Sequence, residues 1–230
     1  MGSTSLPSAH ADEAYARDLL QAMSVYLAAQ TALSFNYDVD IEVVTIEDQK
    51  LAIASSGSVT LNRPDRIRAT RSGGFADVEM AFDGRTLTLL GKSENVYVEI
   101  DTPGTVDHLV DILRDEYGVP LPAADLLLSD VHGALTPLIV DVKDLGVGII
   151  RGVACDHLAF RTDEADFQIW IAQGDHPSPC RYVITTTAVT GWPQYNIDVR
   201  DWRTGTEVAA DDFTLPIPAD AARLTPDALS

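Results

Sequence analysis

Three short runs of alternating apolar and polar residues follow one another in the second half of the chain. They cover residues 153–161, 166–173 and 180–187, and each is bounded by residues that favour turns. Alternation with a period of two, interrupted by polar connections, is typical of antiparallel strands that bury one face. This stretch therefore predicts a β-meander with an apolar face that another part of the protein must cover.

The first half of the chain shows the same alternation over a longer distance, and turn-forming pairs such as Asp83-Gly84 separate its runs. A meander of so many strands must curl or close, because twisted sheets do not stay flat. Further strands are expected at residues 35–45, 51–61, 66–72, 76–82, 85–90, 96–100, 145–150 and 194–203.

Two segments have the spacing of amphipathic helices instead. Residues 12–30 place apolar side chains three and four positions apart. Residues 105–117 carry a second apolar stripe, with Thr105 as the expected N-cap and Gly118 as the expected stop. A shorter helix is expected at 123–128, so that a helical insert follows the first six strands.

These patterns predict the α+β fold class, with a strongly curved antiparallel β-sheet (a half-open barrel) and helices covering its concave face. The expected domain spans residues 12–222 and contains the helical insert at about 105–130. Residues 1–11 are expected to form a disordered leader, and residues 223–230 a frayed tail.

The charge balance restricts the possible partners. Thirty-five acidic residues face sixteen basic ones, which gives a formal net charge of −19. Nucleic acids and anionic membrane surfaces are repelled by such a surface, so neither is expected as a partner. No apolar run is long enough for a transmembrane helix. The N-terminus lacks the regions of a signal peptide, which leaves export undecided by the residues themselves.

Two cysteines, Cys155 and Cys180, allow one disulfide. If Arg161 pairs with Asp166 and Gln173 pairs with Cys180, the cysteines lie on strands that are separated by a third strand. Two strand spacings amount to about 9.5 Å, whereas a disulfide needs Cα atoms within about 7 Å. We therefore expect two free thiols, although a bulge in either strand could shift the register.

No catalytic signature is present: the chain contains no nucleophile elbow, zinc-protease helix, phosphate-binding loop or dinucleotide-binding loop. We therefore expect a protein that is not an enzyme and has no cofactor. Asp38, Asp40 and Glu42 share one strand face and could hold a metal, but a solvated strand face is the favoured interpretation.

Four potential zinc ligands occur in the second meander. Cys155 and His157 share a strand face, and His176 and Cys180 follow on a loop and a strand start. Such ligands suit Zn²⁺, but their spacing matches no known zinc signature. The favoured interpretation is a hydrogen-bonded His157 beside a buried thiol, and no metal site is predicted.

Three arginines of one predicted strand, Arg66, Arg68 and Arg71, are notable in an otherwise acidic chain. They could receive an acidic headgroup. Pairing with neighbouring acidic residues on a solvated face is the favoured interpretation.

The runs CDHLAFR, FQIWI and RYVIT, together with RPDRIRATRSG, FDGRTLTLL and the closing FTLPIP, resemble the DUF2092 family of predicted periplasmic proteins. The resemblance extends over roughly residues 14–222. Proteins of this kind resemble in turn the periplasmic lipoprotein carriers LolA and LolB, in which helices close a half-open barrel around an apolar cavity. The resemblance implies an exported, periplasmic protein and a lipid or other hydrophobic small molecule as its partner.

We expect the cavity to lie between the helix at 12–30, the insert and the sheet. Small residues are expected to leave room in it, namely those at 55–58 and the helix alanines Ala14, Ala16, Ala22, Ala28 and Ala29. The insert is expected to be a moving lid. If side chains fill the interior instead, the protein is a structural or interaction domain. The candidate ligand-binding residues are Tyr37, Ile41, Ile53, Met80, Phe82, Met23, Leu109 and Leu113.

Overall fold

The computed structural model of the protein describes residues 9–73, 76–119, 123–208, 210 and 212–229. In chain order the strands are β1 (Ala32–Val44), β2 (Lys50–Asn62), β3 (Arg66–Gly73), β4 (Ala76–Phe82), β5 (Thr86–Gly91), β6 (Val96–Asp101), β7 (Asp141–Ile150), β8 (Val153–Arg161), β9 (Ala165–Ala172), β10 (Pro179–Thr186), β11 (Gln194–Thr204) and β12 (Ala222–Arg223). The α-helices are α1 (Ala9–Ala28), α2 (Val106–Asp115) and α3 (Val131–Leu135). The 3-10 helices are η1 (Ala124–Leu127), η2 (Thr136–Leu138), η3 (Gly205–Glu207) and η4 (Pro226–Leu229).

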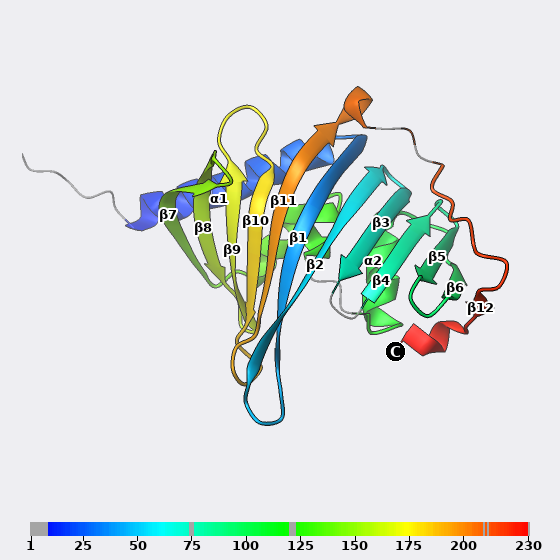
Figure 1. Ribbon diagram of the computed structural model, residues 1–230. Helices are drawn as coiled ribbons and strands as arrows, with labels where there is room; N and C mark the ends of the chain where they lie inside the picture. Colours follow the sequence, from blue (N-terminus) through cyan, green and yellow to red (C-terminus); the bar gives the residue numbers. More distant parts are fainter. Residues whose placement is uncertain (1–8, 74–75, 120–122, 209, 211, 230) are drawn as a thin grey trace, which may run out of the picture.

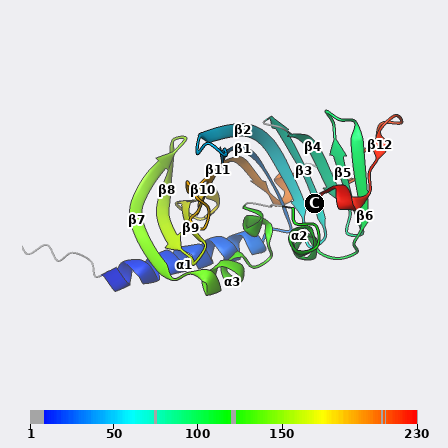
Figure 2. The same ribbon diagram turned by 90° about the horizontal axis from the view of Figure 1, so that it is seen from below.

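All of these strands belong to one sheet, which joins two consecutive meanders. Strands β1 to β6 are neighbours in chain order, as are β7 to β11, and β1 pairs with β11 in antiparallel orientation. The short strand β12 adds to β6 in parallel orientation. Figures 1 and 2 show an open arch with β7 and β12 at its two edges and the helices on its concave side. This confirms the predicted α+β class with a strongly curved antiparallel sheet.

Helix α1 lies on the concave side of the second meander (Figure 2). The three- and four-residue spacing places one face of this helix in the core. The inward side chains, each 0% exposed, are Ala16, Leu20, Met23 and Leu27. Of the five alanines expected to leave room in the interior, four are exposed instead: Ala14, Ala22, Ala28 and Ala29. That expectation is therefore wrong for all but Ala16, because α1 otherwise presents leucine and methionine to the core.

Helix α2 begins where the sequence predicted. The hydroxyl of Thr105 accepts a hydrogen bond from the backbone N–H of His108 at 3.2 Å. Gly118 follows the helix with a φ of +62°, which glycine adopts without strain. The chain then continues through η1. Pro120 and Pro122, which the sequence places within the insert, lie outside the described residues.

The hydrophobic core of the first meander is a row of side chains that crosses six strands. Each member of the row is paired by register with the next and is at most 6% exposed. Buried side chains of α1, α2 and the second meander join this row in one cluster, so both meanders share a hydrophobic core. The row consists of Leu33, Leu61, Ile67, Phe82, Leu87 and Ile100.

The two ends of the expected domain carry regular structure. Helix α1 begins at Ala9, within the expected leader 1–11, while residues 1–8 lie outside the described part of the chain. The expected tail 223–230 contains the last residue of β12 and the 3-10 helix η4. Strand β12 was not predicted, since two residues carry no readable alternation.

The cysteines lie closer together than the predicted register allows. Cys155 faces Ala172, as predicted. Cys180 does not pair with Gln173 but lies at a bulge of β10, where the ladder to β9 shifts. Both thiols are free, and their Sγ atoms are 2.7 Å apart. The prediction of two free thiols is confirmed, but the expectation that an intervening strand keeps the two side chains apart is wrong.

We expect oxidative refolding to join Cys155 and Cys180 in a disulfide, because a small movement brings their sulfur atoms to the bond length of about 2.05 Å. Two thiols lose two protons and two electrons, which reduce oxidised glutathione. Burial raises the pKa of both thiols. Few thiolates therefore form in the folded protein, so refolding in a glutathione buffer is the suitable route.

Mass spectrometry under non-reducing conditions measures the loss of two hydrogens. The cysteines are 25 positions apart, and closing a loop of this kind should raise the free energy of unfolding by about 3 kcal/mol. A Cys155→Ala variant is the control and should be equally stable with and without reductant. Two titratable thiols after oxidative refolding would contradict the prediction.

Charged side chains on the convex face are paired with one another. Asp38 accepts hydrogen bonds from Arg200 at 3.1 Å and from Arg151 at 2.7 Å, and Glu79 accepts one from Arg68 at 2.6 Å. The pKa of Asp38 lies well below its usual range, mainly because of the hydrogen bond from Arg200. For Asp38 and Arg68 these ion pairs agree with the favoured interpretation. Arg71 contradicts it, because this arginine lies in the same row as Gly57 and Val78 and donates a hydrogen bond to Ser55 instead of pairing with an acidic residue of the described part of the chain.

The two histidines of the possible zinc set have separate surroundings. His157 stacks on Trp170 with ring centroids 3.9 Å apart, and its Nε2 lies 2.9 Å from the side-chain oxygen of Gln168. His176 packs against Tyr26 of α1. Within the described part of the chain, no three His, Cys, Asp or Glu side chains are grouped so that they could hold a metal ion.

Candidate ligand-binding site

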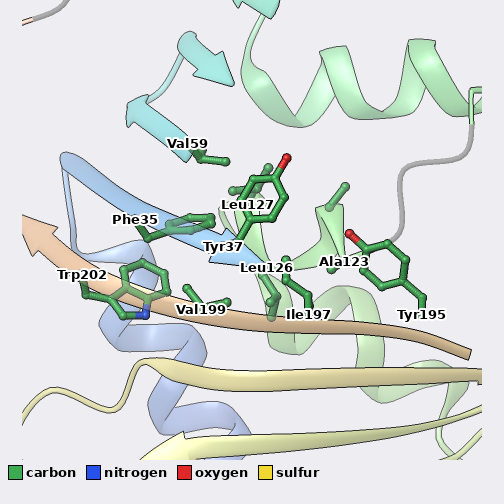
Figure 3. Close-up of a pocket in the computed structure, with 11 residues that line it drawn as sticks. Phe35, Tyr37, Val59, Ala123, Leu126, Leu127, Tyr195, Ile197, Val199 and Trp202 are labelled. Carbon is green, nitrogen blue, oxygen red and sulfur yellow. The ribbon is translucent and has the colours of Figure 1, made fainter. Parts of the chain in front are cut away.

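An apolar cavity of about 140 Å³ lies between strands β1, β2 and β11 and the 3-10 helix η1 (Figure 3). A cavity of about 150 Å³ in another protein binds benzene, whereas sites for drug-sized ligands measure about 300–1,000 Å³. The cavity as it stands therefore has room for a group about the size of benzene. The lining residues are Phe35, Tyr37, Val59, Ala123, Ala124, Leu126, Leu127, Tyr195, Ile197, Val199 and Trp202.

Two aromatic side chains form one end of the cavity. The rings of Phe35 on β1 and Trp202 on β11 are 4.7 Å apart between centroids. The indole N–H of Trp202 donates a hydrogen bond to the backbone oxygen of Pro179 at 3.0 Å. This bond satisfies the polar atom of the indole and fixes the ring, so that the surface left to the cavity is apolar.

Tyr37 lies over Gly57, its partner on β2, and reaches the third strand. Its hydroxyl donates a hydrogen bond to the backbone oxygen of Thr70 on β3 at 2.8 Å. A Cβ at position 57 would lie 2.6 Å from the Tyr37 ring and 1.9 Å from that oxygen. Only glycine permits this arrangement. The space that small residues were expected to leave at this position is therefore occupied by the tyrosine ring.

Besides the indole N–H of Trp202, the polar side-chain atoms of the lining residues are the hydroxyl groups of Tyr37 and Tyr195. Burial raises the pKa of Tyr195 on β11 to about 12, and burial also raises the pKa of Tyr37. Both phenols are consequently protonated at neutral pH. Apolar walls with a few hydrogen-bonding groups are the usual composition of a small-molecule site.

The 3-10 helix η1 forms the side of the cavity opposite the sheet. Leu126 and Leu127 supply its aliphatic surface. Ala123 precedes the helix with a φ of +63°, a left-handed conformation that a residue with a Cβ rarely adopts. The wall on this side is thus one short turn of helix, which is preceded by a residue with a strained backbone.

Only one of the eight predicted ligand-binding residues, Tyr37, lies in the wall of this cavity. Ile41 and Met80 pack against the margin of the core, and Ile53 is half-buried opposite Ile41. The remaining four belong to the core cluster and do not line the cavity: Met23, Phe82, Leu109 and Leu113.

The residues that the sequence prediction missed come mainly from β11 and η1. The alternation of Tyr195, Ile197 and Val199 identified one face of β11, but it did not reveal that β11 pairs with β1. This pairing places the β11 side chains beside Phe35 and Tyr37. No local signal in the sequence could have shown it, because the two strands are far apart in the chain.

An open, curved sheet that holds helices and an apolar cavity on its concave side defines the structural class. A conserved uncharacterised protein from Thermus thermophilus is similar in structure: the TM-score is 0.52 at 12% identity, covering 92% of this chain and 99% of that one. For MucB the TM-score is 0.51 at 16% identity, covering 88% and 63%. For LolA superfamily protein NE2245 from Nitrosomonas europaea the values are 0.41 at 10%, covering 87% and 97%. At these identities the likeness concerns the fold alone.

The chain belongs to the DUF2092 family, described as predicted periplasmic proteins, whose model matches residues 16–225. This confirms both the family resemblance and the periplasmic location inferred from it. A comparison with curated protein sequences found no match. Among the described helices, none is long and apolar enough to cross a membrane.

Proposed function

We propose that the protein binds a lipid or another hydrophobic molecule in the cavity beneath η1, and that it acts by binding and not by catalysis. The observation that carries this proposal is the cavity itself, because its wall is made of aromatic and aliphatic side chains. Well-packed cores leave few voids larger than a water molecule. Periplasmic location supports the proposal, since apolar molecules need a carrier in an aqueous compartment.

The insert is the part that moves in this proposal. One polar contact ties it to the turn between β2 and β3, and another joins two segments of the insert itself. Arg63 donates a hydrogen bond to the backbone oxygen of Leu128 at 3.1 Å. Ser129 donates from its N–H and its hydroxyl to Asp107 of α2. Each such bond contributes about 1 kcal/mol. Displacement of η1 would open the wall of the cavity that Leu126 and Leu127 form.

A fluorescence titration with a polyene fatty acid tests the proposal. The probe gains fluorescence in an apolar site, and we expect saturable binding with one molecule per chain. Competition by unlabelled palmitate should reverse the signal. A signal that rises without saturation, or no signal at all, would contradict binding in a defined cavity and would favour a structural or interaction domain.

The buried carboxyl group of Asp125 in η1 should make the stability of the protein depend on pH. Burial raises the pKa of Asp125, and nearby Arg114 offsets this only in part. The carboxyl group of Asp125 therefore binds its proton more tightly in the folded state than in the unfolded state. At low pH the group is protonated and does not destabilise the protein, whereas the free energy of unfolding falls as the pH rises above about 4.

Asp125→Asn removes this cost. The variant should be more stable than the parent protein at pH 7, and the difference should shrink as the pH approaches 4. Urea unfolding at several pH values measures it, with the exposed Asp130→Asn as the control at which no such trend is expected. A stability difference that grows towards acidic pH would contradict the assignment.

A further inference from the structure

One arginine lies on the concave, apolar face of the first meander. Register places Arg71 of β3 opposite Gly57 on one side and opposite Val78 on the other. Gly57 in turn faces Tyr37, whose ring lines the cavity. Arg71 therefore belongs to the same row of side chains as Tyr37 and points to the same side of the sheet.

No other described concave position of β1 to β6 carries a charge. The strand register assigns these positions, and apart from Arg71 they hold aliphatic residues, aromatic residues, glycines and one serine, Ser55. The arginines at positions 66 and 68 alternate to the opposite face. A lone cation on such a face requires a specific explanation, because a charge is costly near apolar surface unless it is paired.

Arg71 has no anionic partner among the described residues. Its Nε donates a hydrogen bond to the hydroxyl of Ser55 at 3.1 Å, and Ser55 is only 5% exposed. This contact orients the guanidinium without neutralising it. The nearby phenols of Tyr37 and Tyr195 remain protonated and supply no negative charge. Arg71 differs in this respect from Arg68, which pairs with Glu79.

We propose that Arg71 binds the anionic headgroup of an amphiphile whose apolar tail occupies the cavity beneath η1. This inference rests on the proposed function and names its ligand class: an acyl chain that ends in a carboxylate or a phosphate. Tyr37 connects the tail cavity with the headgroup position at Arg71, because its ring lines the cavity while its hydroxyl reaches β3 next to Arg71. Arginine can bind either anion, because its planar guanidinium group donates two parallel hydrogen bonds.

The test compares ligands that share one tail and differ in the headgroup. Palmitate, hexadecyl phosphate and uncharged methyl palmitate compete with a neutral fluorescent lipid for the full-length protein. Arg71→Gln should weaken binding of at least one anionic ligand by about tenfold or more, and it should leave methyl palmitate unchanged. A loss confined to palmitate assigns a fatty acid, and a loss confined to hexadecyl phosphate assigns a phosphate-bearing lipid.

Two further variants separate a headgroup contact from a general loss of structure. Arg71→Lys keeps the charge and should recover part of the lost affinity. Arg66→Gln removes a charge from the other face of the same strand and should change nothing. Thermal unfolding checks that each variant is folded.

The outcomes distinguish this inference from the proposed function. Equal binding of all three ligands by the parent protein and by Arg71→Gln would overturn the headgroup assignment and leave the cavity proposal intact. An equal loss of methyl palmitate and of the anionic ligands in Arg71→Gln would also overturn it, because the arginine would then act on the tail site. Failure of all three ligands to bind the parent protein would overturn both.

Discussion

Replacing Val59 and Val199 together with phenylalanine should abolish uptake of an apolar ligand while the protein stays folded. Both valines line the cavity, one from β2 and one from β11, and each is 6% exposed. The free volume is about 140 Å³, so two larger side chains fill most of it. Added methylenes strain a dense core, but they are tolerated where a void receives them.

The expected result is at least a tenfold loss of affinity for the fatty-acid probe, with a melting temperature that changes by no more than about 4 °C. Val147→Phe is the matched control. It adds the same side chain on β7, where Val147 is 61% exposed, and it should leave probe binding unchanged. A folded double variant that binds the probe like the parent protein would show that the ligand lies elsewhere.

Phe82→Ala should destabilise the protein by about 3–5 kcal/mol, the usual cost of truncating a fully buried aromatic side chain. Phe82 is 0% exposed and belongs to the core row that crosses six strands. Met80 lies two positions earlier on the same face but is only partly buried. Met80→Ala should therefore cost clearly less.

Urea unfolding followed by circular dichroism measures both losses. The comparison decides whether Phe82, which the sequence suggested as a ligand contact, is a core residue. A loss below about 1 kcal/mol in Phe82→Ala, together with weakened probe binding, would place it in the ligand site and contradict the core assignment.

The strands and their local pairings could be predicted from the sequence because they depend on short-range signals. Alternation of apolar residues identified β8 with both of its ends, and the short connection after it fixed the pairing of Arg161 with Asp166. The hydroxyl of Thr105 likewise fixed the start of α2. In each case the residues that determine the structure lie within a few positions of one another.

Two features of the sheet, a strand pairing and a bulge, could not be predicted from the sequence because they depend on distant or irregular contacts. The pairing of β1 with β11 joins segments about 160 positions apart, as the hydrogen bond between Asp38 and Arg200 illustrates. The bulge at Cys180 shifts a register that the turn length alone would set differently. The first determines which residues line the cavity, and the second brings the two thiols together.

The predicted ligand-binding residues also show how far a local sequence pattern can identify a site. Tyr37 was identified because it lies on the apolar face of its strand, but so does Phe82, and the pattern does not distinguish a cavity wall from a filled core. The difference arises from packing in three dimensions. Phe82 is 0% exposed and surrounded by other members of the buried core cluster, whereas Tyr37 is only partly buried and lines the cavity together with residues of η1.

Lipid mass spectrometry on protein purified from the periplasm of its own host tests the central claim most directly. The parent protein and the Val59→Phe, Val199→Phe double variant are produced and extracted in parallel, so that adventitious lipid appears in both samples. We expect about one apolar molecule per chain, with an acidic headgroup, in the parent protein and none in the double variant. Equal lipid content in the two samples, or none in the parent protein, would contradict it.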